Sequence, residues 1–449
     1  MLRLLYNRKT VIGQLYLYFS VYFMTASAPT AMSLFLLVLA ILALESADSI
    51  RFLYRHFLCR ITDKSLNSFY YACSYAKVDY TKFLTVTTSL AMSIVPPELL
   101  SQPVFLCIDD TMVEKYGKRF ENVSTLFDHA AHNGSSYLNG HCFVSLMLCI
   151  PVWNRENVIY QSVPLGYRMW QKDKSKLVLA AEMVRQTMPS LQKATNVILL
   201  CDSWYGKSEI MNLVHEFSTL NVICNVRYDT VLYDLKPKPT GKWGRPPSHG
   251  KRLSITDDFV FSDVKIGKHY IAHRSVLTNL LKGQILEAFV TSPDGDGSRR
   301  LFLSTISAEQ LSIPFVYQQM YMEEKLNANE LIYIPYLLYA FRWKIEVGYY
   351  EQKTFWSLCR YMVRNAKGIE MLVNLVNISY SAMKILPYAD KTFAVYRDMG
   401  TQEFRFVLSQ KIHEQIFLST FVESAGKAIK SKHAVNRLKQ WISNEYFAA

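Results

Sequence analysis

The feature that most constrains the fold is the order of apolar segments between residues 104 and 228. Some of these segments are short and continuous, as in buried strands, whereas others repeat apolar residues at intervals of three and four, as in helices. In chain order the sequence predicts strand 104–111, strand 141–152, strand 158–166, helix 174–188, strand 196–202, helix 208–217 and strand 221–228. The order is therefore β-β-β-α-β-α-β, which indicates a mixed sheet flanked by helices.

This order of elements is what an RNase H-like fold requires, so we predict an α/β protein with an RNase H-like mixed-sheet catalytic core. The first part of the core spans residues 99–228 and the second part spans residues 313–390. Between the two parts the sequence predicts short strands at 258–264, 269–274, 288–291 and 300–305. Residues 229–312 are therefore expected to form a β-rich insertion.

Acidic residues follow two of the predicted strands. In strand 104–111, alternation puts Asp109 and Asp110 on opposite sides, so only one of them can face a site shared with the next strand. Asp202 ends strand 196–202 and opens into the crevice beyond the carboxyl ends of the strands, where open α/β sheets bind ligands. Acids at strand ends also serve as turn formers, and Asp202 can equally cap the helix that follows.

Four polar residues near the C-terminal end have helical spacing. Successive intervals of three, four and seven residues separate Tyr339, Arg342, Glu346 and Lys353. At about 100° per residue their side chains fall inside an arc of about 60° and span roughly 20 Å, long enough to follow several phosphates of a nucleic acid. Taken alone, this spacing also fits an ordinary amphipathic helix with a wet face.

Together, these motifs resemble those of the DDE transposases of bacterial insertion sequences, in the class with a Tyr-Arg-Glu-Lys signature. The segment from Tyr339 to Glu346 is similar in its intervening residues as well, and Asp202 follows an apolar strand and a Cys, as in the second motif of the family. The first catalytic acid of the family stands directly before a Thr, which here is Asp110. Residues 115–123 and the pair Asp128-His129 are also similar.

The resemblance implies that Asp110, Asp202 and Glu346 are catalytic and hold two Mg²⁺ ions, for which Mn²⁺ can substitute. Three carboxylates suit this chemistry, because Mg²⁺ prefers an octahedral shell of oxygen ligands. Two ions about 3.5–4 Å apart generate the nucleophile and stabilise the leaving oxygen. The resemblance further implies that the other signature residues clamp phosphates near the cut end, and these are Tyr339, Arg342 and Lys353.

The resemblance also implies a cut-and-paste reaction on double-stranded DNA. Such enzymes cut each element end, commonly through a DNA hairpin, and join the freed 3′-hydroxyl to target DNA inside a dimeric complex. Some relatives carry a Trp before the last strand of the insertion, where this chain has Arg299-Arg300, so either Phe302, Trp243 or another aromatic residue substitutes or the hairpin step differs. A metal-dependent DNA endonuclease without strand transfer, or an inactive DNA-binding relic, remains as the alternative.

Residues 236–252 form a basic segment that contains Pro and Gly but no acid. Its six cations are Lys236, Lys238, Lys242, Arg245, Lys251 and Arg252. The whole chain has 50 Lys and Arg against 37 Asp and Glu, a net charge of +13, which favours a polyanionic partner. We therefore expect the segment to contact DNA, with a solvated linker as the alternative interpretation.

Residues 11–44 contain no charged side chain, which raises the question of a membrane span. Pro29 divides this stretch, and the apolar run 34–44 is shorter than the roughly 18–20 residues that a bilayer needs. We therefore expect a buried helix within an all-helical, DNA-binding N-terminal domain of residues 1–98, with a membrane anchor or signal as the alternative. Residues 391–449 are expected to form a helical region that contributes to dimerisation.

The cysteine pattern indicates the compartment. None of the eight cysteines forms a Cys-x-x-Cys pair, and several lie in apolar strand-like segments. Such cysteines are typical of buried thiols in a reducing cytoplasm, and they favour neither a zinc site nor a disulfide framework. We expect a bacterial cytoplasmic protein that associates with the nucleoid.

Overall fold

The computed structural model describes residues 5, 7–117, 119–127, 136–238, 247–263, 265–295, 297–322, 326–428 and 436. The chain forms two compact units, each built from segments that are distant in sequence. The helical unit consists of Met1–Val78, Arg360–Val363 and Met399–Ala449, and the sheet unit consists of Asp79–Cys359 and Arg364–Asp398. We expected the first boundary near residue 98 and a separate C-terminal region. The first division instead falls after Val78, and the C-terminal region belongs to the same unit as the N-terminal helices.

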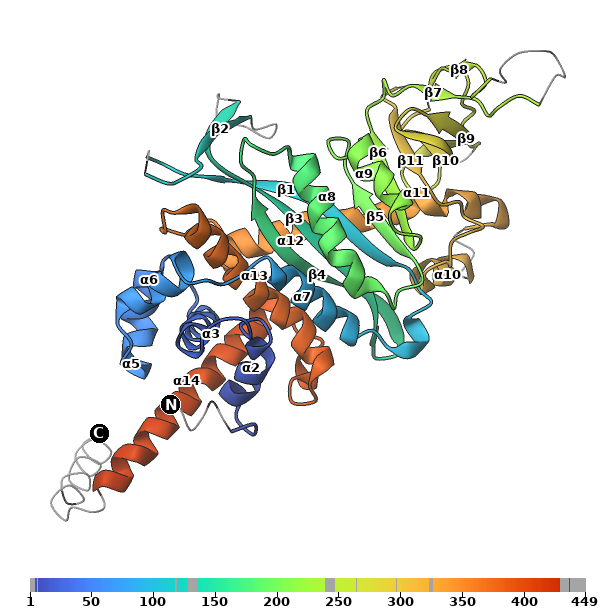
Figure 1. Ribbon diagram of the computed structural model, residues 1–449. Coiled ribbons are helices and arrows are strands. Elements are labelled where there is room, and N and C mark those ends of the chain that lie inside the picture. Colours follow the sequence, from blue (N-terminus) through green and yellow to red (C-terminus); the bar gives the residue numbers. More distant parts are fainter. Residues whose placement is uncertain are drawn as a thin grey trace. The chain divides into compact units, whose positions relative to one another are not determined.

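One large mixed sheet dominates the sheet unit (Figure 1). The described strands are β1 (Val104–Glu114), β2 (Ser124–Phe127), β3 (Tyr137–Asn154), β4 (Asn157–Met169), β5 (Val197–Cys201), β6 (Leu220–Val226), β7 (Leu232–Tyr233), β8 (Arg252–Leu253), β9 (Tyr270–Thr278), β10 (Leu281–Ser292) and β11 (Arg300–Ser304). Their order is β2-β3-β1-β5-β6-β11-β10-β9-β7-β8, and β4 pairs with β3. β1 is antiparallel to β3 and parallel to β5, which is in turn parallel to β6. The mixed α/β class is confirmed, and the arrangement is consistent with an RNase H-like core.

The insertion extends this sheet. Antiparallel pairing of β11 with β6 joins the inserted strands to the core. The predicted strands 269–274, 288–291 and 300–305 are confirmed within β9, β10 and β11. The prediction of a strand at 258–264 was wrong for its described residues, 258–263. There the side chain of Asp258 accepts hydrogen bonds from the backbone N–H of Ser254 (2.8 Å) and from Lys251 (2.6 Å), which stabilises a turn.

Helices cover both faces of the sheet (Figure 1). The described helices of this unit are α7 (Lys82–Ser93), η2 (Pro97–Leu99), α8 (Lys176–Thr187), η3 (Met188–Leu191), α9 (Ser208–Met211), η4 (Asn212–His215), α10 (Phe315–Met322), η5 (Ala328–Tyr333), α11 (Ile334–Leu338), η6 (Tyr339–Arg342), α12 (Trp343–Phe355), α13 (Ala366–Ala389) and η7 (Ala394–Tyr396). On one face, the ring of Phe105 in β1 stacks on Phe341 in η6 with centroids 4.2 Å apart. On the other face, the ammonium of Lys176 in α8 reaches β1.

Helix α13 is the core helix expected after the signature segment. By length and composition it is the one helix among the described residues that meets the criteria for a membrane span, but 94% of its most apolar window is buried inside the protein. Its polar side chains bond to β4: Asn374 accepts from the N–H of Tyr167 (2.9 Å), and Ser381 donates to the carbonyl of Pro164 (2.6 Å). These contacts satisfy backbone groups of β4 near its bulge, where the hydrogen-bond ladder of the sheet is interrupted. Helix α13 is therefore part of the buried core of the sheet unit.

The helical unit is organised around one apolar helix. Its described helices are α2 (Val11–Ser20), α3 (Ala28–Ala43), α4 (Ile50–Leu53), the π-helical turn η1 (Tyr54–Leu58), α5 (Cys59–Ile61), α6 (Leu66–Ser74) and α14 (Thr401–Ala428). Burial of α3 is nearly complete from Ser33 to Ala43. Arg405 of α14 donates to the carbonyls of Ile41 (2.8 Å) and Leu44, at the C-terminal end of α3. A cation at this end satisfies free carbonyls and complements the helix dipole. The most apolar part of the uncharged stretch is thus the buried helix α3, whose C-terminal end is bonded to α14.

Candidate active site

The register of the sheet decides which aspartate of β1 faces the second predicted acid. Cys107 of β1 is paired with Leu200 of the parallel strand β5. Two residues further along each strand, the same face carries Asp109 and Asp202. The neighbouring residue Asp110 therefore points to the opposite face.

Asp109 is a nearly buried carboxylate with one charged partner. Its Oδ2 accepts from Nη1 of Arg342 at 3.0 Å, and its Oδ1 accepts from the backbone N–H of Asp110 at 2.8 Å. Burial and, second, the charge of Asp202 raise the pKa of Asp109 to about 7. The second contribution shows that the carboxylate of Asp202 lies near that of Asp109, as it does where carboxylates converge to bind a cation.

The signature residues reach this cluster from η6 and α12. Arg342 ends η6, and its Nη2 donates to Oε1 of Glu346 in the first turn of α12. The guanidinium therefore bridges Asp109 and Glu346, and its side chain is only 15% exposed. The predicted single α-helix is in fact a 3₁₀ turn followed by an α-helix. Tyr339 and Arg342 stay on one side, because residues three apart are aligned in a 3₁₀ helix.

Tyr339 and Lys353 lie at the two ends of the signature. The ring of Tyr339 lies 5.8 Å from the guanidinium carbon of Arg342 and packs edge to face on Phe302, with ring centroids 5.0 Å apart. Phe302 is 5% exposed, so it is not available to stack on a base. Lys353 lies near the end of α12, and its ammonium reaches β1, where it donates to the carbonyl of Met112 at 3.0 Å.

Asp202 follows β5 and closes a tight turn. Its Oδ1 accepts from the backbone N–H groups of Trp204 (3.0 Å) and Tyr205 (3.3 Å). It does not cap the following helix, because α9 starts only at Ser208. Burial raises the pKa of Asp202, although these hydrogen bonds and the charge of Arg342 oppose that effect. The charge of Asp202 in turn raises the pKa of Asp109, so the two carboxylates lie near each other.

Asp110 has a separate set of partners on the other face. Its Oδ2 accepts from the ammonium of Lys176 at 2.8 Å and from the thiol of Cys142 at 3.1 Å, and its Oδ1 accepts from the hydroxyl of Tyr205 at 2.9 Å. The expectation that Asp110 lies beside Glu346 is therefore corrected: the structure brings Asp109, Asp202 and Glu346 together around Arg342. Only the pairing of two distant strands reveals this, and no local motif carries that information.

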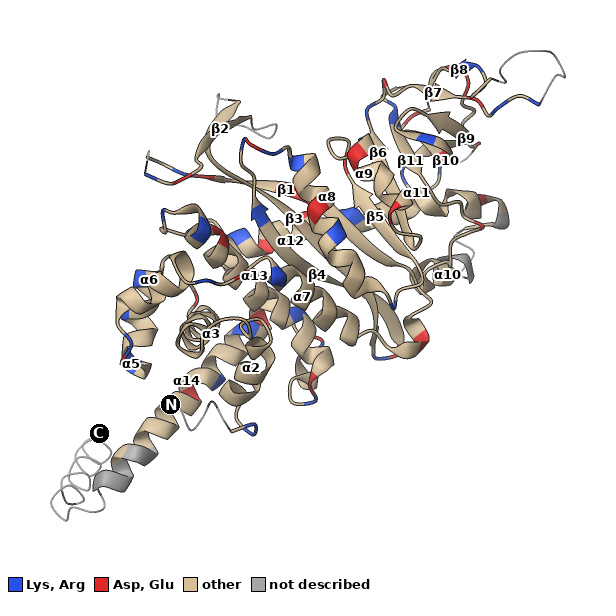
Figure 2. Ribbon diagram, in the orientation of Figure 1, with Lys and Arg blue, Asp and Glu red and all other residues tan. Residues whose placement is uncertain are grey.

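The basic segment is described only in part. Lys236 and Lys238 are exposed, Lys251 forms an ion pair with Asp258 at 2.6 Å, and Arg252 lies in β8. The two predicted contacts Lys242 and Arg245, the aromatic Trp243, and the pair Asp128-His129 lie outside the described residues. Figure 2 shows blue segments on both sides of the interruption in this loop.

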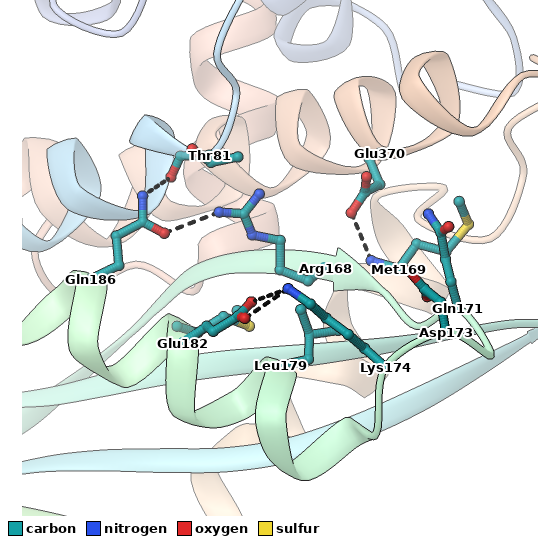
Figure 3. Close-up of a pocket in the computed structure, with 11 residues that line it drawn as sticks. Thr81, Arg168, Met169, Gln171, Asp173, Lys174, Leu179, Glu182, Gln186 and Glu370 are labelled. Carbon is teal, nitrogen blue, oxygen red and sulfur yellow. Dashed lines mark hydrogen bonds and ion pairs between the residues drawn. The ribbon is translucent and has the colours of Figure 1, made fainter. Parts of the chain in front are cut away.

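A pocket beside α8 is distinct from the carboxylate cluster (Figure 3). Its polar side chains are bonded to each other: Lys174 contacts Glu182 at 2.7 Å, and Arg168 donates to Gln186 at 3.0 Å. Glu370 at its border accepts from the backbone N–H of Met169 at 2.7 Å. These bonds connect α8, β4 and α13, which indicates a structural role for the pocket lining.

The donor set of the cluster fits a hard divalent cation. Three carboxylates from β1, the end of β5 and α12 supply oxygen ligands only, the kind that Mg²⁺ prefers. Within the described part of the chain, no three acidic, His or Cys side chains already have a metal-binding arrangement. In the carboxylate cluster, the guanidinium of Arg342 bonds to oxygens of Asp109 and Glu346 and so takes the place that a cation would occupy.

Comparison with known proteins identifies the family. The family described as DDE superfamily endonuclease matches residues 30–265, which is 236 of the 449 residues. The match includes β1 and β5 with Asp109, Asp110 and Asp202, and it ends before Glu346. No curated protein matches the chain.

The match to this family supports a nuclease that acts as a transposase or endonuclease, and such enzymes normally use divalent metals. Because the match covers more than half of its length, the chain belongs to the DDE superfamily endonuclease family.

Proposed function

We propose that the chain is the transposase of a bacterial insertion sequence, of the Tyr-Arg-Glu-Lys class, which cuts the element ends and joins them to target DNA. The observation that carries this proposal is the convergence of Asp109, Asp202 and Glu346 around Arg342 on one face of the sheet. Each acid comes from an element that the resemblance to this class assigns to catalysis. The first acid is Asp109 in place of the expected Asp110.

In this proposal Asp109, Asp202 and Glu346 hold two Mg²⁺ ions, and Mn²⁺ can substitute. When bound, the ions supply activation of a water or 3′-hydroxyl nucleophile and stabilisation of the leaving oxygen. No protein nucleophile is required. Arg342 now bonds to Asp109 and Glu346, and if ions took up these carboxylate oxygens its guanidinium would be free to grip a phosphate beside the cut in a forked contact. Tyr339 and Lys353 would extend this grip along the backbone.

The proposed partners are double-stranded DNA and a second copy of the chain within the DNA complex, and the proposed location is the bacterial cytoplasm. An endonuclease without strand transfer shares all of the site residues. The net charge of +13 and the exposed Lys236 and Lys238 support a polyanionic partner for either activity.

The test uses duplexes that carry the DNA flanking the coding sequence, incubated with the full chain, Mg²⁺ and a supercoiled target plasmid. Cutting at the element ends together with joined products supports transposition, whereas cutting without joining supports the endonuclease. Asp109→Asn serves as the inactive control. Absence of metal-dependent cutting by the unchanged chain would refute both activities.

A further inference from the structure

The backbone pairing of β1 with β5 ends before the carboxylate cluster. The last backbone pair described for these two strands is Cys107 with Leu200. Asp109 and Asp202 each lie two residues beyond that pair. Their carboxylates repel each other, since the charge of Asp202 raises the pKa of Asp109. This repulsion tends to separate two chain segments that the ladder of the sheet no longer joins.

The turn that carries Asp202 is compact and lies against β6. The backbone N–H of Gly206 donates to the carbonyl of Asp202 at 2.9 Å. The side chain of Asp202 accepts from the N–H groups of Trp204 and Tyr205 in the same turn. A Cβ atom at Gly206 would lie only 2.5 Å from the carbonyl oxygen of Asn225 in β6. The carboxylate of Asp202 is thus fixed to its own turn, so its position depends on where that turn lies.

Tyr205 joins this turn to β1 on the other face of the sheet. Its side chain is buried, and its hydroxyl donates to Oδ1 of Asp110 at 2.9 Å. The second oxygen of Asp110 accepts from the ammonium of Lys176 in α8 at 2.8 Å and from the thiol of Cys142 in β3 at 3.1 Å. Asp110 is therefore held by two further elements, and the lysine balances its charge. A hydroxyl bond to a carboxylate is stronger than one between neutral groups.

This bond lies directly behind the carboxylate cluster. Asp110 is the next residue after Asp109, and Tyr205 is the third residue after Asp202. A bond between Asp110 and Tyr205 on one face therefore opposes the repulsion of the two carboxylates on the other. Mg²⁺ requires its oxygen ligands at about 2.0–2.1 Å in nearly octahedral geometry. A small outward movement of the turn would therefore weaken a site that two segments share.

We propose that the bond between Tyr205 and Asp110 is a latch that holds the carboxylates of Asp109 and Asp202 at the separation that a shared divalent cation needs. Tyr205 and Asp110 are positioning residues, and neither of them contacts the ion or the DNA. The inference rests on the proposed metal-dependent action on DNA. It gives Asp110 a task other than the metal binding that the family resemblance implies for it.

Metal affinity, measured without DNA, tests the latch. The full chain is titrated with Mn²⁺, and the electron paramagnetic resonance signal of the free ion gives the bound fraction. Tyr205→Phe removes only the hydroxyl and should weaken Mn²⁺ binding about 10-fold, the lower end of the range for losing an outer contact of a metal ligand. Asp110→Asn keeps an oxygen for the hydroxyl and should weaken binding less than Asp110→Ala. Combining Tyr205→Phe with Asp110→Ala should weaken binding no further than Asp110→Ala alone, because both changes break the same bond.

Tyr80→Phe is the matched control. The hydroxyl of Tyr80 also donates to a carboxylate in the sheet unit, that of Glu370 at 2.5 Å, beside the pocket that is distinct from the cluster. Tyr80→Phe should lower the Tm, as Tyr205→Phe does, but leave Mn²⁺ affinity unchanged. In DNA cleavage, Tyr205→Phe should raise the Mg²⁺ concentration for half-maximal rate about 10-fold and leave the rate at saturating Mg²⁺ nearly unchanged. A purely structural role for Tyr205 would change the Tm without changing either metal dependence.

Failure of the latch and failure of the proposed function give different results. If the unchanged chain cuts DNA and Tyr205→Phe equals it in Mn²⁺ affinity and in the Mg²⁺ dependence of cleavage, the latch is refuted and the proposed function stands. If Asp110→Asn abolishes Mn²⁺ binding while Tyr205→Phe leaves it intact, Asp110 is itself a ligand and the latch is again refuted. If the unchanged chain neither binds Mn²⁺ nor cuts DNA, both proposals fall. Circular dichroism of each variant shows that the fold is retained.

Discussion

The Nη1 atom of Arg342 lies 3.0 Å from Oδ2 of Asp109, while Nη2 of the same guanidinium donates to Glu346. The cation holds together two carboxylates that would otherwise repel each other in a partly buried site. Asp202 is close enough to raise the pKa of Asp109 further. In the proposed mechanism, Arg342 and a divalent cation therefore compete for the same oxygen atoms.

This competition predicts that Arg342→Gln makes thermal stability depend more strongly on Mg²⁺. Without metal, the variant leaves the acids uncompensated and should lose about 3 kcal/mol of unfolding free energy, as when one partner of a buried ion pair is removed. Because Mg²⁺ binds the folded state, it should restore the variant and raise its Tm more than it raises that of the unchanged chain. Calorimetry in EDTA and in Mg²⁺ measures both effects. Lys353→Gln, whose ammonium bonds to a carbonyl, is the control. Equal Mg²⁺-induced shifts in all three proteins would contradict the competition.

A second prediction distinguishes the neighbouring aspartates. Asp109→Asn should reduce metal-dependent cleavage by about 10³-fold or more, because it removes a shared ligand, and Asp202→Asn and Glu346→Gln should do the same. Asp110→Asn should cost far less, since its partners are Lys176 and Tyr205. Single-turnover cleavage at saturating DNA measures the difference. The opposite ranking, with Asp110 essential and Asp109 dispensable, would show that β1 uses its other face.

The strands that carry the candidate site could be predicted from sequence, but the face of β1 that meets Asp202 could not. Strand period and chain order are local properties, so β1, β3, β4, β5 and β6 were all predicted within a few residues. Which of Asp109 and Asp110 meets Asp202 depends on the pairing of Cys107 with Leu200, on two strands that are distant in sequence. The family motif predicts Asp110 as the first acid, whereas the register places Asp109 on the face that carries Asp202.

The unit boundaries could not be predicted for a related reason. Arg405 has no local signal that connects it to α3, yet it donates to carbonyls at the end of that helix. Similarly, the inserted strands have ordinary hairpin patterns, and only the pairing of β11 with β6 shows that they extend the core sheet. Interactions between distant segments decide both features.

The third prediction is that the cations of the basic segment differ in how much each contributes to DNA binding. Neutralising Lys236 and Lys238, which are exposed, should weaken DNA binding and lower the salt slope by about 0.9 for each phosphate that the variant no longer neutralises. Lys251→Gln should have a smaller effect, because this lysine is already paired with Asp258. Binding titrations over a range of salt concentrations measure the slopes. An unchanged slope in the double variant would identify the segment as a solvated linker.

The fourth prediction concerns the helical unit. Arg405→Met should lower the free energy of unfolding by about 1–3 kcal/mol, because it leaves the carbonyls of Ile41 and Leu44 buried without a donor. Arg405→Lys should recover part of this stability, since one ammonium can reach one carbonyl at a time. Urea denaturation measures both variants. Lys411→Met, also in α14, is the control. A destabilisation no larger than that of the control would show that α14 does not stabilise the end of α3.

The last prediction is a pH dependence that arises from Lys115. This side chain is 8% exposed and donates to the carbonyl of Cys359 at 2.6 Å, and burial lowers its pKa from 10.5 to about 8. Between these two values the unfolded chain binds more protons than the folded chain, so the contribution of Lys115 to stability rises as the pH increases from about 8 to 10.5, by at most about 3 kcal/mol. Below pH 8 the folded state carries the full cost of a charged buried lysine.

Lys115→Met should therefore gain stability relative to the unchanged chain at pH 7 and lose that advantage near pH 10. Urea titrations of the pair across this range measure the difference, with Lys174→Met as the exposed control. A constant difference between the two proteins across the range would show that Lys115 keeps an ordinary pKa in the folded chain.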